Sequence, residues 1–91
     1  MSVTAVAEIQ AGLQEWLSLH LAAQLRVPEG TIDPDEPMSA YGLDSLRTVA
    51  VLMDVEEHVG FPIDSDVLWD YPTIAAFARF LAEQTASQQP T

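Results

Sequence analysis

Ser45 is the residue whose type and surroundings most favour chemistry. It lies in the run GLDSL (residues 42–46), after a long acidic segment and at the expected first turn of a helix. A serine at this place can cap the helix, but Asp44 can supply the cap instead, which leaves the Ser45 hydroxyl available to another group. Free backbone N–H groups and the helix dipole stabilise negative charge at this end, so the position favours an attached phosphate.

A catalytic role for Ser45 is not supported by its neighbours. The nucleophilic serine of a hydrolase has glycine two positions before and two positions after it, a pattern that GLDSL lacks. His20 and His58 are the only histidines and have no second ligand at metal-binding spacing, so we expect both to be solvated or packed against helices. A minimal serine hydrolase is therefore the last of our hypotheses, and absence of turnover by the purified chain would eliminate it.

Metal and thiol chemistry find little support in the sequence. Asp33, Asp35 and Glu36 suggest calcium, but an EF-hand loop requires a ligand and then glycine where this chain has Pro37 and Met38. We therefore expect a solvated acidic loop there and no metal. The chain has no cysteine, which excludes disulfides, thiolate nucleophiles and cysteine metal sites and is compatible with a reducing cytoplasm.

The charge of the chain is strongly negative. The chain has fourteen Asp and Glu residues, three arginines and no lysine, which gives a formal net charge of −11. Nucleic acids and anionic membranes would repel such a surface, because proteins bind both through Lys and Arg. A protein partner with a basic patch is the natural complement. Neither a secretory leader nor a membrane span is expected, because the N-terminal segment has no basic residue and the longest apolar runs have five residues.

Apolar residues are spaced for helices throughout, and no alternation typical of strands is present. Three substantial helices and one short helix are predicted, the first with an N-cap near Thr4 and the last with an N-cap at Thr73. Their expected ranges are 4–26, from Asp44 or Ser45 to Val59, 65–69, and from Thr73 onward. We predict an all-α four-helix bundle over residues 4–85, followed by a flexible tail at residues 86–91.

The first two helices are joined by a long loop, residues 27–43. Three prolines, two glycines and four acids break any periodicity there. Its isolated apolar residues are expected to anchor the loop to the core: Val27, Ile32, Met38 and Leu43. Loops of this length often carry function or lie across a bundle.

The second helix is predicted to have two apolar faces, because its residues follow one another at about 100°. One face, directed at the core, consists of Val51, Leu52, Val55 and Val59. The other consists of Leu46, Val49, Ala50 and Met53, beside the acids Asp54, Glu56 and Glu57. This second face is either another buried stripe against the long loop or a docking surface with apolar anchors and an acidic rim.

GLDSL and the later run EEHVGFPIDSDVLWDYPTIAAFARFLAEQ (residues 56–84) together resemble the carrier domains of polyketide synthases. In acyl carrier proteins an Asp-Ser-Leu opens a helix after an acidic loop, and an aromatic-Asp-Tyr-Pro-Thr run precedes the last helix. The resemblance implies a four-helix bundle in which Ser45 receives 4′-phosphopantetheine from coenzyme A, transferred by a separate magnesium-dependent enzyme. The carrier itself would catalyse nothing, and the thiol of the arm would hold acyl groups as thioesters.

The resemblance also implies roles for residues around Ser45. Asp44 would cap the helix and present Ser45, and partner enzymes would bind at Leu46, Arg47, Met53, Glu56 and Glu57. The expected partners are a phosphopantetheinyl transferase, an acyltransferase or acyl-adenylating ligase, and a ketosynthase with other assembly-line enzymes. Arg47 departs from fatty-acid carriers, which usually have an acid there, and with the WDYPT run it favours specialised metabolism.

Several alternatives stay open. Tyr41 and Arg47 are also similar to aryl carriers, and the WDYPTI run suits fatty-acyl carriers that are loaded by an adenylating ligase. Peptidyl carriers fit less well, because they typically have glycine where this chain has Leu43 and Asp44. The rival from another class is an acidic adaptor without prosthetic group, in which Ser45 only caps a helix. As a carrier, the chain is expected to be monomeric and cytoplasmic.

Overall fold

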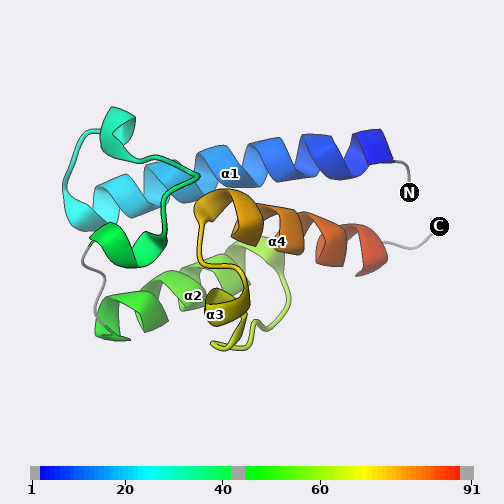
Figure 1. The fold of residues 1–91 in the computed structure, drawn as a ribbon. Helices are drawn as coiled ribbons and strands as arrows, with labels where there is room; N and C mark the ends of the chain where they lie inside the picture. Colours follow the sequence, from blue (N-terminus) through cyan, green and yellow to red (C-terminus); the bar gives the residue numbers. More distant parts are fainter. Residues whose placement is uncertain (1–2, 42–44, 89–91) are drawn as a thin grey trace.

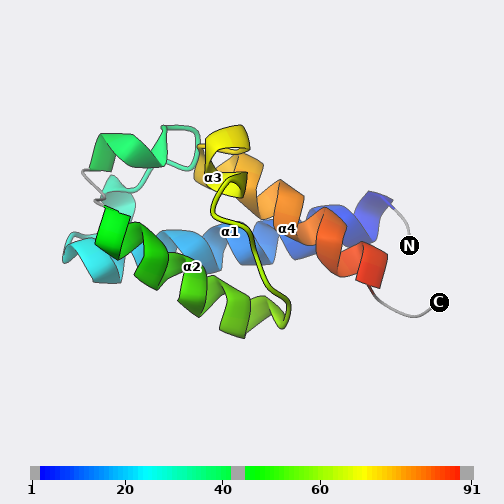
Figure 2. The ribbon, with the colours of Figure 1, turned by 90° about the horizontal axis from the view of Figure 1, so that it is seen from below.

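The computed structural model describes residues 3–41 and 45–88, and these contain four α-helices, two short 3₁₀ helices and no strand. In chain order they are α1 (Val3–Leu25), the 3₁₀ helices η1 (Glu29–Thr31) and η2 (Met38–Tyr41), α2 (Ser45–Val59), α3 (Val67–Asp70) and α4 (Ile74–Gln88). Figures 1 and 2 show α1 and α4 side by side, with α2 packed beneath them in the view of Figure 1. The predicted all-α bundle with a long first connection is confirmed.

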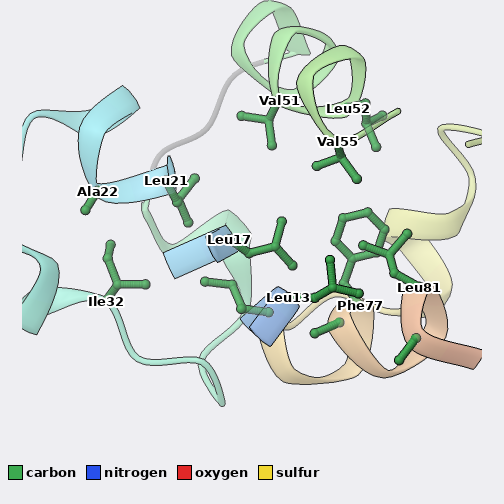
Figure 3. Close-up of a cluster of buried hydrophobic side chains, with 13 residues drawn as sticks. Leu13, Leu17, Leu21, Ala22, Ile32, Val51, Leu52, Val55, Phe77 and Leu81 are labelled. Carbon is green, nitrogen blue, oxygen red and sulfur yellow. The ribbon is translucent and has the colours of Figure 1, made fainter. Parts of the chain in front are cut away.

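The core lies between α1, α2 and α4 and consists of aliphatic side chains around one phenylalanine (Figure 3). α1 contributes the stripe Leu13, Leu17 and Leu21, as its apolar spacing predicts. Phe77 of α4 is 1% exposed, and Ala78 beside it in the chain is fully buried. A small buried side chain on α4 allows a neighbouring helix to approach closely, and each large one stabilises the fold by about 1.5–3 kcal/mol.

α1 ends one residue earlier than predicted, and the turn after it takes Val27 out of the core. Arg26 adopts the left-handed conformation (φ 57°), and the N–H groups of Arg26 and Val27 donate to the carbonyls of Ala23 and Ala22 at 3.3 and 3.0 Å. This is a Schellman closure with arginine at the position where glycine is most common. Because the Val27 backbone closes the helix, its side chain is 38% exposed, and the prediction that it anchors the loop is wrong.

The long loop is anchored at two of the other predicted positions. Ile32 is buried and Met38 is half-buried against the core, while Leu43 lies outside the described residues. Tyr41 contacts the acidic part of the loop through two hydrogen bonds. Its hydroxyl donates to the Asp33 carbonyl at 3.1 Å and accepts the Asp33 N–H at 2.6 Å. The described part of the loop, residues 27–41, is thus held by its own hydrogen bonds and by its contacts with the core.

The start of α4 is fixed by its own cap and by the long loop. The Thr73 hydroxyl accepts the N–H of Ala76 at 3.1 Å, which confirms the predicted N-cap. The Met38 N–H donates to the carbonyl of Pro72 at 2.8 Å, so the loop and the residue before the cap are joined directly. Segments far apart in the sequence therefore meet where α4 begins.

The other helix boundaries differ slightly from the prediction. α1 begins at Val3, so Thr4, expected near the N-cap, lies inside the helix. α3 covers residues 67–70 rather than 65–69. α4 continues through Gln88, so that residues 86–88 of the expected tail are helical, and residues 89–91 lie outside the described part of the chain.

Candidate functional site

Ser45 is the first residue of α2, at the end of the bundle away from the beginning of α1 and the end of α4 (Figures 1 and 2). The next residue, Leu46, is 79% exposed, and Arg47 is exposed as well. The first turn of α2 contains no acidic side chain. A phosphate attached there would meet the positive end of the helix dipole without a carboxylate from that turn. Asp44, the predicted cap, lies outside the described residues.

α2 has the two faces that its periodicity predicts. Val51, Leu52 and Val55 are buried in the core. The opposite apolar face is exposed, with exposed fractions of 79% for Leu46, 50% for Val49 and 62% for Met53; we call these three residues the α2 patch. The alternative that this face is a second buried stripe is therefore wrong, and the patch is open to a partner.

The acids beside the α2 patch have different surroundings. Glu57 is exposed and makes no hydrogen bond or ion pair among the described residues. Glu56 is half-buried, and its carboxylate accepts the N–H of Ile63 at 2.7 Å, which fixes the chain after α2. The Asp54 carboxylate pairs with His20 of α1 at 2.8 Å. Of the two glutamates predicted to meet partners, Glu56 thus already has a structural contact within the chain.

An aromatic cluster that the sequence interpretation missed joins α1 to α2. The ring of Trp16 stacks on His58 of α2 at a centroid distance of 4.0 Å and on His20 of α1 at 4.9 Å, with interplanar angles of 11° and 6°. We call these three residues the aromatic clasp. His20 is half-buried and His58 is exposed, which agrees with the prediction that the histidines are solvated or packed against helices. The spacing of Trp16 and His20, one helical turn apart, was the available signal for their contact.

A groove opens between η2, α2, α3 and α4, and Val49 of the α2 patch is part of its lining. It encloses about 600 Å³, and its lining includes Met38 of η2, Val49 of α2, Leu68 and Trp69 of α3, and Phe77 of α4. Trp69 is 85% exposed although it is the largest apolar side chain of this region. Nothing in the local sequence distinguishes an exposed tryptophan from a buried one here, so the groove could not be predicted.

Two further searches concern the described residues alone. Within residues 3–41 and 45–88, no group of three or more His, Asp or Glu side chains could hold a metal ion. The Asp33 carboxylate instead accepts the N–H of Asp35 at 2.9 Å, a local turn. None of the described helices is long and apolar enough to cross a membrane.

Comparison with known proteins identifies the family. Residues 15–81 match the family described as "Phosphopantetheine attachment site". The chain belongs to this family. Members carry 4′-phosphopantetheine as a covalently attached group, and they are carrier domains rather than catalysts. The resemblance that the GLDSL and WDYPT runs indicated is confirmed.

Similar proteins include a polyketide synthase and a discrete acyl carrier protein. It is 36% identical over 85 residues to a phenolphthiocerol/phthiocerol polyketide synthase of Mycobacterium tuberculosis, a match that covers 93% of the chain and 4% of the synthase. It is 33% identical to the acyl carrier protein TtuC of Teredinibacter turnerae, over 77% of this chain and 80% of that protein. The chain thus spans a small part of the synthase and most of TtuC.

A solved structure with the same fold is the free-standing peptidyl carrier protein from a secondary metabolic pathway of Acinetobacter baumannii. The TM-score is 0.77 and the identity 36%, over 82% of this chain and 94% of that one. The bundle alone therefore does not separate acyl carriers from peptidyl carriers. Carrier domains of polyketide synthases work with the other enzymes of an assembly line.

The start of α2 fits the family's prosthetic group. A hydroxyl-bearing residue opens the helix, its neighbours are exposed, and no acid stands in the first turn. A phosphodiester formed there would carry one negative charge at the positive end of α2. When bound, the group supplies the thiol that the chain lacks, since the sequence has no cysteine.

Proposed function

We propose that Ser45 is the attachment residue and that this chain carries acyl or polyketide intermediates between enzymes. The observation that supports the proposal is the place of Ser45 in GLDSL, as the first residue of α2 within a matched phosphopantetheine attachment family. In the modification, the Ser45 oxygen forms a bond to the phosphorus next to the pantetheine of coenzyme A. The pyrophosphate bond breaks, and adenosine 3′,5′-bisphosphate leaves. A separate magnesium-dependent transferase would accept the hydroxyl proton.

The chain's own residues would then position the arm and meet partners, not make or break bonds. The exposed α2 patch offers apolar contacts at Leu46 and Met53, with Arg47 and Glu57 beside them. Glu57 would steer a basic partner surface by long-range attraction, as would the net charge of −11. The expected partners are a phosphopantetheinyl transferase, a loading acyltransferase or adenylating ligase, and a ketosynthase.

The pathway assignment is part of the same proposal. The similarity to a polyketide synthase and to a discrete acyl carrier protein favours polyketide-type cargo. Loading by an adenylating ligase, with a fatty-acyl or aryl cargo, is the second candidate and is favoured by the WDYPTI run. The domain range 4–85, the monomeric state and the cytoplasmic location stay predictions.

The proposal is tested by intact mass after incubation with coenzyme A, magnesium and a broad-specificity phosphopantetheinyl transferase. We expect the parent and a Ser65→Ala control to gain one phosphopantetheine, and Ser45→Ala to gain none while it keeps its helical circular dichroism. Ser65 is an exposed serine in the segment between α2 and α3, so its replacement should leave the modification unaffected. If the folded parent gains no mass, or if Ser45→Ala gains mass, attachment at Ser45 is refuted. The first of these outcomes would also favour the acidic adaptor.

A further inference from the structure

We propose that Met53 is a modification site: hydrogen peroxide oxidises its thioether to methionine sulfoxide, and this oxidation weakens the binding of partner enzymes at the α2 patch. The second part of the inference rests on the proposed function, because it concerns enzymes that act on a carrier. The first part depends only on the chemistry and the surroundings of the methionine sulfurs of this chain.

Met53 is the accessible methionine among the described residues. The chain has three methionines and no cysteine, so its only sulfur atoms before any prosthetic group is attached are thioethers. Met53 is 62% exposed, and its side chain makes no hydrogen bond or ring contact with the described residues. Met38 is half-buried and packs against the core, and Met1 lies outside the described residues. Because an oxidant must reach the sulfur, Met53 should react well before Met38.

The oxidation needs only a peroxide as its second reactant. A lone pair on the Met53 sulfur attacks one oxygen of hydrogen peroxide, and the O–O bond breaks. The leaving hydroxide takes the proton of the new S–OH group and becomes water. The sulfur loses two electrons and the peroxide gains them, so the products are one sulfoxide and one water. Hydrogen peroxide carries no charge, so the net charge of −11 does not repel it as it would an anionic oxidant.

The oxidation changes a part of the α2 patch that a partner would cover. The patch consists of three exposed apolar side chains, and Met53 supplies the most flexible of them. Flexible, polarisable thioethers suit a surface that meets several enzymes, because they adapt to different partners. A sulfoxide has a polar S–O bond that is hydrated in water, and an apolar partner surface that covers it removes this water without replacing its hydrogen bonds. Oxidation should therefore lower the affinity of the patch for its partners.

The same oxidation should leave the fold intact. Met53 is not part of the buried core, to which α2 contributes Val51, Leu52 and Val55. Met38 differs, because it packs against the core and lines the groove. The two methionines thus form a matched pair. A sulfoxide at Met53 should change binding without a change in stability, and a sulfoxide at Met38 should lower stability.

Peptide mapping shows which methionine reacts. The three methionines fall in three different tryptic peptides, residues 1–26, 27–47 and 48–79, because the chain has three arginines and no lysine. After brief exposure of the folded, unmodified chain to hydrogen peroxide, we expect peptide 48–79 to gain one oxygen, about 16 Da, at least about fivefold faster than peptide 27–47. Fragmentation of peptide 48–79 assigns the oxygen to Met53 rather than to Trp69. Methionine sulfoxide reductase should remove it.

The effect on a partner is measured with a phosphopantetheinyl transferase, after catalase has removed the peroxide. Initial rates at increasing carrier concentration give KM and kcat, and intact mass reports the loading. We expect oxidation of the parent to raise KM about three- to tenfold with little change in kcat, and the reductase to reverse the rise. Met38→Leu should respond to peroxide as the parent does, and the KM of Met53→Leu should be the same before and after peroxide. Met53→Gln, which places a polar group there, should have a raised KM without peroxide.

The two parts of the inference can fail separately. It is overturned if Met38 is oxidised as fast as Met53, if oxidation of Met53 leaves KM unchanged, or if Met53→Leu shows the same rise as the parent. A lower urea midpoint of the chain oxidised only at Met53 would place the effect in the fold and overturn it as well. If the untreated, folded parent gains no phosphopantetheine, the proposed function is refuted and the effect on partners falls with it. The peptide map still decides whether Met53 is the site of oxidation.

Discussion

The adjacent acids Glu56 and Glu57 should differ sharply in what they contribute to folding. The Glu56 carboxylate accepts the Ile63 N–H at 2.7 Å and is half-buried, whereas Glu57 is exposed and makes no such contact among the described residues. Hydrogen bonds to a charged group contribute about 1.5–3 kcal/mol. Partial exposure weakens that value through solvent screening, so we expect Glu56→Ala to cost about 1–2 kcal/mol and Glu57→Ala less than about 0.5 kcal/mol.

Chemical and thermal unfolding measure this difference. For a domain of this size, 1 kcal/mol corresponds to roughly 4–8 °C in Tm, so Glu56→Ala should lower Tm by roughly 4–16 °C. Urea unfolding, followed by circular dichroism at 222 nm, should show a lower midpoint with an unchanged slope, because the surface exposed on unfolding is the same. Glu56→Gln keeps an oxygen acceptor without the charge and should fall between the parent and Glu56→Ala.

Glu56 and Glu57 lie in the same turn of α2, so Glu57→Ala is a matched control for Glu56→Ala. Both substitutions remove one negative charge and both place alanine in a helix, so their effects on net charge and helix propensity are the same. If Glu56→Ala and Glu57→Ala lower the unfolding free energy equally, the contact with Ile63 contributes nothing. If Glu56→Gln is as stable as the parent, the negative charge of the Glu56 carboxylate does not contribute to the free energy of unfolding.

Four other outcomes follow from the fold and the site. Phe77→Ala should lower the unfolding free energy by about 3–5 kcal/mol because Phe77 is 1% exposed, and a loss below 1 kcal/mol in urea unfolding would contradict its place in the core. Thr73→Ala should cost about 0.5–2 kcal/mol through the lost cap, and Thr85→Ala, later in the same helix, should cost less in the same assay. His58→Ala should lower stability by about 0.5–1.5 kcal/mol and change Trp16 emission, and unchanged emission would show that the clasp does not persist in solution. Glu57→Lys should slow association with a basic transferase, with a smaller effect at high salt in stopped-flow mixing, and an unchanged rate would remove Glu57 from the partner surface.

The helices were predictable because their signals are local. The apolar stripe of α1, the buried face of α2 at Val51 and Val55, and the cap at Thr73 depend on spacing within one element. The same holds for Ser45, since its place at the start of α2 follows from GLDSL and the long loop before it. Periodicity and capping residues therefore predicted the helices and the place of Ser45, the proposed attachment residue, at the start of α2.

The remaining features depend on how elements meet, and the sequence does not report that. Val27 looked like a loop anchor, but the closure of α1 through Arg26 directs it outward. The sequence suggested that Glu56 borders the docking surface as an exposed acid. In the structure its carboxylate accepts the N–H of Ile63, because the chain after α2 passes beside it. Trp69 belongs to a recognisable run, yet it is 85% exposed and lines a groove together with residues of η2, α2 and α4.

The two ends of α2 have different roles. Three polar or aromatic contacts join its second half to the rest of the chain: Asp54 pairs with His20, Glu56 accepts the N–H of Ile63, and His58 stacks on Trp16. Ser45, the proposed attachment residue, is the first residue of α2, and the α2 patch extends from Leu46 to Met53. Substitutions of Asp54, Glu56 and His58 should therefore act mainly through stability. Substitutions in the α2 patch or at Glu57, which are exposed, should act mainly through partner binding. A carrier needs this separation, because an anchored helix end lets the other end meet several enzymes without unfolding.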